Sequence, residues 1–191
     1  VNPASARGHL SLGALLASPD PGEPMDLAAA EAHLRRAHAI NGEETGPVVR
    51  LGEVLLVLGR DGEAQDWLEA ALRTNPKSLE AAFLGGFAAW DRGSPEVERL
   101  VCRVREAARV EAPVKGVLSE GDRKDAKRVA APPLESPLGR LLFGAPIAAL
   151  RGRAAAGEPI DDALVSSLWR EARRLRRQHS ERSRAALRLT S

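Results

Sequence analysis

Apolar residues recur along most of this chain at intervals of three and four, the spacing of a helix that buries one face. The clearest stretch runs from 48 to 75, where two such apolar stripes flank a glycine at position 59. Strand-like alternation of apolar and polar residues is missing, and so is the β-branched and aromatic enrichment of strands, since aromatic residues make up 3% of the chain. The pattern predicts an all-α protein.

Small residues repeat at a nearly fixed period within this helical pattern. Leu12-Gly13, Leu51-Gly52 and Gly85-Gly86 follow one another at intervals of roughly 34–39 residues, a period typical of repeat architectures. A glycine inside a helix lets a second helix approach its backbone, and Gly59 suits a turn that only glycine adopts cheaply. Asn75-Pro76 then ends the second helix, because proline cannot continue it. The spacing predicts helix-turn-helix units.

This pattern resembles the tetratricopeptide repeat, a pair of antiparallel helices with a repeat length of about 34 residues. The resemblance covers three copies, at about 4–44, 45–78 and 79–110, although the usual large aromatics of the middle copy are replaced by Val48, Leu55 and Leu68. The first copy is longer because the loop ASPDPGEPMD carries extra residues, and the third is degenerate in its second helix. The family implies an α-solenoid of stacked helix pairs in a right-handed superhelix. Asn2-Pro3 matches the end of a repeat, so we expect further repeats upstream in a longer parent protein.

The second half of the chain loses this regularity and then regains it. Residues 111–137 are rich in proline and charge and predict an irregular linker, with a short helix near 122–129. Residues 138–191 predict a pair of helices that caps the array and ends in a basic tail. The first of these helices is expected to be interrupted near 144–146, and the second to begin at Asp161 and Asp162 and to fray from about 180.

Catalytic and metal-binding patterns are missing from the sequence. Its four histidines, His9, His33, His38 and His179, have no helical i, i+4 partner that would complete a metal site, and no nucleophile-elbow or phosphate-binding glycine motif occurs. We therefore predict no catalytic residue, no cofactor and no metal. The single cysteine, Cys102, excludes an internal disulfide and is expected to be a small buried apolar residue.

The resemblance also implies a binding surface. In this family the first helix of each pair lines the concave face, and the matching positions here form a largely apolar row: Leu10, Val49, Glu53, Leu56, Phe83, Phe87 and Trp90. Such a row can hold a helical or extended peptide. Alternatively, the chain's own linker or C-terminal helices cover it and complete a core, because large exposed apolar patches are rare. The family's carboxylate clamp is not supported, since Ser11, Arg50 and Leu84 occupy its positions.

Charge is distributed unevenly. Residues from 139 onward contain 11 arginines and 5 acids, whereas the rest of the chain is net acidic. A cluster on the last predicted helix forms a possible basic patch: Arg170, Arg173, Arg174, Arg176 and Arg177. It can be a solvated helix face, a contact for an acidic protein surface, or a phosphate-binding surface for nucleic acid.

The sequence as a whole predicts a non-catalytic scaffold that binds a protein or peptide, including another region of its own parent chain, in the concave groove. One alternative is an accessory region of a larger enzyme whose catalytic domain lies upstream. A second is a nucleic-acid adaptor acting through the basic helix. No stretch approaches the roughly 18 apolar residues of a membrane span.

Overall fold

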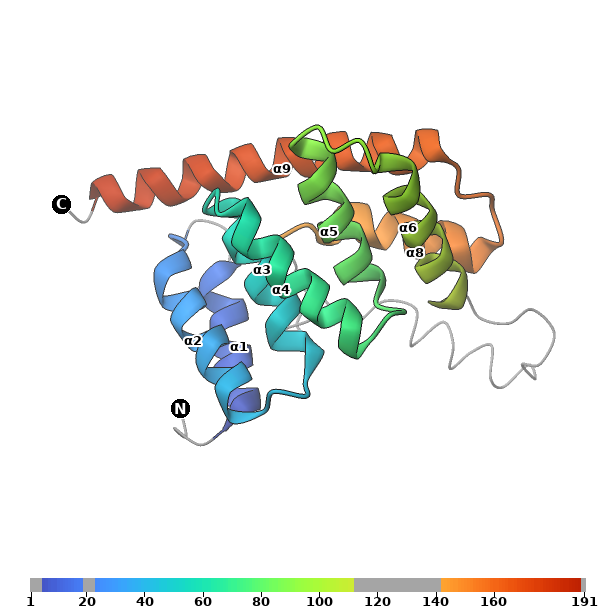
Figure 1. Ribbon diagram of the computed structural model, residues 1–191. Coiled ribbons are helices and arrows are strands. Elements are labelled where there is room, and N and C mark those ends of the chain that lie inside the picture. Colours follow the sequence, from blue (N-terminus) through green and yellow to red (C-terminus); the bar gives the residue numbers. More distant parts are fainter. Residues whose placement is uncertain (1–4, 19–22, 112–141, 190–191) are drawn as a thin grey trace.

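The computed structural model describes residues 5–18, 23–111 and 142–189, and within them every regular element is a helix (Figure 1). This confirms the predicted all-α fold. None of these helices is both long and apolar enough to cross a membrane. The eight helices are α1 (Ala6–Ala17), α2 (Leu27–Ile40), α3 (Thr45–Val57), α4 (Asp61–Thr74), α5 (Leu79–Asp91), α6 (Val97–Glu111), α8 (Gly144–Ala156) and α9 (Asp162–Leu189).

Side-chain oxygens cap the starts of several helices. Ser5, Asp26 and Ser78 each accept a hydrogen bond from the backbone N–H three residues later, which satisfies a donor that the first helical turn leaves free. The turn between α3 and α4 uses Gly59 at a φ of +79°, as the sequence predicted. These local signals place the helix starts and the turn where the repeat pattern requires them.

Consecutive helices pack as stacked antiparallel pairs. The first pair is α1–α2, the second α3–α4 and the third α5–α6; α2 also packs on α3, and α4 on α5. Within the second pair the helices approach closely at Gly52, where an added Cβ would lie 2.7 Å from Cγ of Leu68. The first helices α1, α3 and α5 also contact one another in order. This arrangement is that of an α-solenoid of the tetratricopeptide type.

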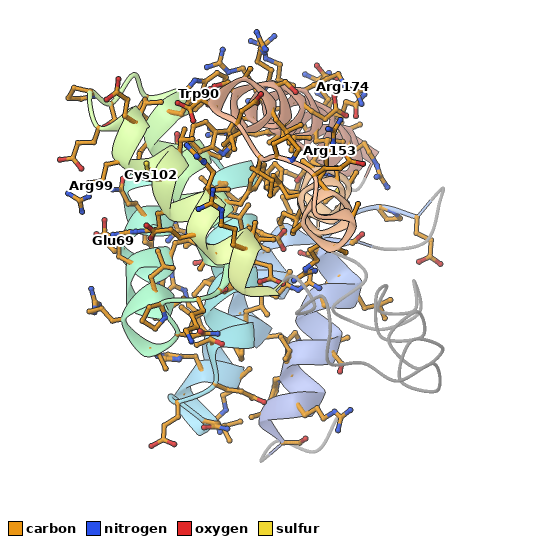
Figure 2. The ribbon with its side chains drawn as sticks, turned by 90° about the vertical axis from the view of Figure 1, so that its right-hand side faces the viewer. Glu69, Trp90, Arg99, Cys102, Arg153 and Arg174 are labelled. Carbon is orange, nitrogen blue, oxygen red and sulfur yellow. The ribbon has the colours of Figure 1, made fainter. Side chains whose placement is uncertain are left out.

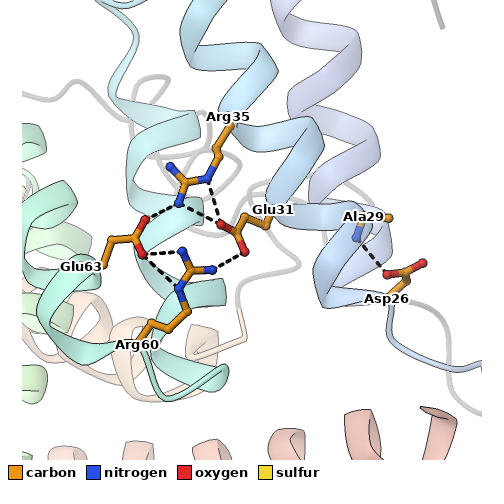
Figure 3. A network of polar contacts seen from close by, with 6 residues as sticks. All are labelled: Asp26, Ala29, Glu31, Arg35, Arg60 and Glu63. Atoms are coloured by element: carbon orange, nitrogen blue, oxygen red, sulfur yellow. Dashed lines mark hydrogen bonds and ion pairs between the residues drawn. The ribbon is translucent and has the colours of Figure 1, made fainter.

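A ring of charges joins the first two pairs (Figure 3). The Arg60 guanidinium, in the turn before α4, lies 2.7 Å from Glu31 of α2 and also pairs with Glu63. Arg35 of α2 pairs with Glu31 at 2.8 Å and closes the ring by pairing with Glu63 of α4. Each charge of the ring faces two of the opposite sign, so the ring links α2 to the start of α4.

The third pair departs from the pattern in its second helix. Cys102, one repeat length after the buried Leu68, is exposed, so the prediction that it is a buried apolar residue was wrong. α6 instead buries Val101, Val104 and Ala108. The inward face of α6 is therefore shifted along the sequence relative to that of α4, which turns the cysteine outward. Cys102 and Arg99 lie on an outer edge, away from Arg153 and Arg174 (Figure 2).

The C-terminal helices α8 and α9 are joined by a turn at Gly157, whose φ is +70°. α8 begins at Gly144, with Pro146 in its first turn, where a missing N–H costs nothing; the part of the expected helix at 138–141 lies outside the described residues. Asp161 accepts a hydrogen bond from the N–H of Leu164 at 2.8 Å, as expected for the start of α9. The predicted fraying from about 180 was wrong, because α9 continues to Leu189.

The long helix α9 contacts α3, α5, α6 and α8, and runs across the array (Figure 1). The expected linker, apart from Glu111, and its short helix near 122–129 lie outside the described residues.

Candidate functional site

The row of residues predicted to line the concave face is largely covered in this structure. We call the row the inner wall; it consists of Leu10 on α1, Val49, Glu53 and Leu56 on α3, and Phe83, Phe87 and Trp90 on α5. The α3 residues are buried, and so are Phe83 and Phe87, whereas Leu10 and Trp90 are half-buried. Leu10 lies beside Gly46 at the start of α3. Of the two alternatives left open by the sequence, this burial favours coverage by the chain's own C-terminal helices.

The indole of Trp169 is the centre of this coverage. A Cβ added at Gly86 of α5 would lie 2.6 Å from Cζ2 of Trp169, so the ring occupies space that only a glycine leaves. Its Nε1–H donates to the backbone carbonyl of Phe83 at 3.2 Å, and the ring centroid lies 6.0 Å from that of Trp90. Trp169 is thus fully buried with its one polar group satisfied.

The segment that begins α8 is held from two sides. The Phe143 ring packs 5.7 Å from Phe87 between centroids, and the Phe143 N–H donates to Glu53 on α3 at 3.4 Å. His179 of α9 donates from Nε2 to the carbonyl of Leu142 at 3.1 Å. The inner wall therefore holds Phe143, and α9 holds the adjacent Leu142.

Burial perturbs the two titratable groups at this point. Desolvation raises the pKa of Glu53 to about 7, although Arg50, at 3.2 Å, and the Phe143 N–H both favour the charged form. Desolvation also lowers the pKa of His179 below its ordinary value, against the hydrogen bond to Leu142. Both shifts favour the neutral form, as expected for groups covered by packed helices.

The basic patch divides into arginines that face the array and arginines that face away. Arg176 pairs with Asp61 of α4 at 2.6 Å and with Asp91 of α5 at 2.9 Å. Arg173 also pairs with Asp91, and its guanidinium lies 4.3 Å from the ring centre of Trp90. Arg174 pairs with its helical neighbour Glu171, and the remaining two, Arg170 and Arg177, are exposed. Part of the patch therefore serves to attach α9.

A polar cleft of about 700 Å³ follows the seam between α9 and the ends of α3, α4 and α5. Asp61, Asp91, Arg173 and Arg176 line it together with the exposed Arg177. The seam that attaches α9 is thus partly open to solvent along its charged side.

Sequence reasoning missed several residues of this site. Asp61, Asp91 and Phe143 are marked by no feature of the repeat pattern. Trp169 adjoins Leu168 in the last predicted helix, where Leu164, Leu168, Ala172 and Leu175 recur at intervals of three and four and form an apolar stripe. That stripe was the one available signal for a helix that docks elsewhere.

The structure also brings together two histidines that the sequence left separate. Nδ1 of His9 on α1 lies 2.8 Å from Nδ1 of His33 on α2, with the rings stacked. The crossing of α1 and α2 near Gly13 and Leu34 is the signal that could have found them. Within the described part of the chain, no three histidine, cysteine or carboxylate side chains gather as a metal site would require.

Comparison with known families finds a match to a tetratricopeptide-repeat model over residues 25–84. The matched stretch begins just before α2 and ends within α5, so it includes the whole second pair. This agrees with the resemblance found in the middle copy. Comparison with curated proteins and with solved structures yields no match.

Proposed function

We propose that this chain is a non-catalytic protein-interaction scaffold that binds a helical segment along its inner wall. Tetratricopeptide repeats are typically protein-interaction modules. The observation that carries the proposal is the seating of α9 on α5, because Trp169 is bound by residues more than 80 positions away through shape, a hydrogen bond and flanking ion pairs. A wall that binds one helix in this way has the features needed to bind another.

The proposed mechanism is geometric. Stacked helix pairs hold Glu53, Phe83 and Phe87 at fixed separations before any ligand arrives, so little conformational entropy is lost by the wall when a ligand binds. The apolar side chains supply burial, and the acids at the edge select the charge of the ligand.

The two alternative functions have less support. Two arginines of the basic patch, Arg173 and Arg176, are engaged by Asp61 and Asp91, which leaves fewer cations for a nucleic acid. A titration of binding across salt concentrations tests that role, since phosphate contacts give a steep dependence. An accessory role within a larger enzyme is compatible with the scaffold, and the full-length protein sequence tests it.

A site-specific photo-crosslink tests the proposal. p-Benzoylphenylalanine replaces Trp90, which is half-buried on the inner wall, and in a matched variant replaces Cys102, which is exposed on the outer edge. Each full-length variant is expressed in cells of the organism that makes the protein and irradiated there, and crosslinked proteins are identified by mass spectrometry. Each identified protein is then tested for binding in purified form.

We expect a purified partner to crosslink at position 90 and not at position 102. The proposal is contradicted if partners crosslink only at position 102, or if position 90 crosslinks only to α9 of the same molecule under every condition used.

A further inference from the structure

The third helix pair contains a hole at Gly86 that a helix from outside the pair fills. In the second pair, Gly52 is covered by Leu68 of α4. Gly86 lies one repeat length after Gly52, but the residue one repeat length after Leu68 is Cys102, which faces outward. The space over Gly86 is taken by Trp169 of α9. We call this hole the Gly86 socket; it is bounded by Gly86, the carbonyl of Phe83 and the ring of Trp90.

Two carboxylates lie beside the socket and face α9. Asp61 is the first residue of α4 and Asp91 the last of α5, and each retains less than a fifth of its side-chain exposure. The ion pairs found for them in the described residues are all with Arg173 and Arg176 of α9. Partly buried acids of this kind favour a basic occupant, because removing their cations leaves charge without compensation.

The residues of α9 that make these contacts share one helical face. Arg173 and Arg176 follow Trp169 by four and seven residues, so an aromatic anchor and two cations project toward the array together. Arg173 also stacks over Trp90 at the edge of the socket. Trp169, Arg173 and Arg176 thus make the contact from two turns of one helix.

Resting on the proposed function, we infer that α9 is a displaceable ligand of the array and that the partner is an amphipathic basic helix of the same kind. The partner helix presents an aromatic side chain to the Gly86 socket and arginines four and seven residues later to Asp91 and Asp61. α9 and the partner compete for one site, so the chain restrains its own binding surface until a helix with these features displaces α9.

The test uses the intact chain and a fluorescein-labelled peptide of residues 162–189. Fluorescence anisotropy measures peptide binding to the wild type and to two variants that weaken the internal helix, Trp169→Ala and the double variant Arg173→Glu, Arg176→Glu. Arg170→Glu is the matched control, because Arg170 is exposed on the same helix. The double variant leaves the apolar core unchanged, so it serves if Trp169→Ala fails to fold.

We expect at least one weakened variant to bind the peptide roughly 30-fold more tightly than the wild type or Arg170→Glu, the scale of a central tryptophan anchor. Adding Gly86→Leu to that variant should abolish this gain. Adding Asp91→Arg to the weakened variant instead should weaken its binding of the wild-type peptide, because two cations would then face each other. A peptide that carries Arg173→Glu should restore binding to this protein, because the charges are then opposite again.

Equal peptide binding by wild type and weakened variants overturns the inference, as does binding that survives Gly86→Leu. If no variant binds the peptide, α9 is a permanent part of the core and the inference also fails. The scaffold proposal is judged separately, because a partner that crosslinks at position 90 without any α9-like helix would support the scaffold and refute the displaceable helix.

Discussion

At the scale of single residues, two glycines at equivalent repeat positions contact different helices. Gly52 admits Leu68 from the adjacent helix of its own pair, whereas Gly86 admits Trp169 from α9. The sequence shows the two glycines as equivalent, one repeat length apart, whereas their neighbours in the structure differ. The same absence of a side chain thus stabilises a repeat at one position and accepts an aromatic anchor at the other.

The close contact at Gly52 predicts a destabilised Gly52→Ala variant. The new methyl group would meet Leu68 at 2.7 Å, and since Leu68 is fully buried it has little room to move. We expect the free energy of unfolding to fall by about 1–3 kcal/mol in urea denaturation. Gly152→Ala on α8 is the control: no atom lies within 4 Å of its added Cβ, so it should gain about 0.5–1 kcal/mol from helix propensity. A loss of equal size in both variants would contradict this account.

The buried carboxyl of Glu53 predicts a pH dependence of stability. Burial raises its pKa from 4.5 to about 7, so the folded protein binds this proton more tightly than the unfolded chain does. The contribution of Glu53 to stability therefore falls as the pH rises from about 4.5 to 7. His179, whose pKa is lowered, acts in the opposite direction below its ordinary value of 6.5, so the wild-type profile alone does not isolate Glu53.

Comparison with Glu53→Gln isolates the effect, because glutamine does not titrate. Unfolding in urea at pH 5, 6, 7 and 8 should show the stability of the variant rising relative to the wild type by roughly 2–3 kcal/mol across that range. Any constant offset from the altered Arg50 contact cancels in this difference. A difference that stays level with pH would show that Glu53 is already ionised at pH 5 in the folded protein.

At the scale of elements, α6 shows where repeat spacing stops being informative. The repeat length predicts that Cys102 takes the place of Leu68, yet Val101, Val104 and Ala108 are the residues that α6 buries. Two orientations of α6 compete: one buries its valines, and the other buries Cys102 and exposes a valine. The first is favoured because it removes more apolar surface from water. Local hydrophobic pattern therefore outweighs the repeat frame when the two disagree.

This orientation of α6 predicts the reactivity of the cysteine. The thiol of Cys102 should react with Ellman's reagent in the folded protein at the rate of an exposed thiol. In a Cys102→Ala background, a Val101→Cys thiol should react only after denaturant is added, since Val101 is buried. Protection of Cys102 together with rapid labelling at position 101 would place α6 in the repeat frame after all.

The helix pairs themselves follow from the sequence because their signals are local. Ser78 and Asp161 cap helices, Gly59 and Gly157 turn the chain, and each acts through neighbours within a few positions. The coverage of the inner wall has no such signal. The contacts of Trp169 with Phe83 and of Phe143 with Glu53 join residues 86 and 90 positions apart, and no periodicity relates the partners. The sequence therefore allowed two alternatives, an open inner wall and a covered one. It did not predict which is correct, because that depends on where α9 packs.

At the scale of the whole molecule, α9 joins the second and third helix pairs. Arg176 reaches Asp61 at the start of the second pair's second helix and Asp91 at the end of the third pair's first helix. Ser180 adds a hydrogen bond to the carbonyl of Val57 at the end of α3, at 2.9 Å. α9 thus adds contacts that link the second and third pairs, beside those that α3 and α4 make with α5.

Neighbouring arginines on α9 allow this role to be tested. Arg176 keeps 17% of its side-chain exposure and holds two partly buried acids, so Arg176→Ala should lower the free energy of unfolding by roughly 1–3 kcal/mol, because both acids lose a charged partner. Arg177 is exposed, and Arg177→Ala should change it by no more than about 0.5 kcal/mol. Urea denaturation followed by tryptophan fluorescence measures both, because Trp90 and Trp169 lie beside this contact. Equal effects of the two substitutions would mean that apolar packing around Trp169 alone attaches α9, and that the charges at Asp61 and Asp91 set its orientation without adding to its stability.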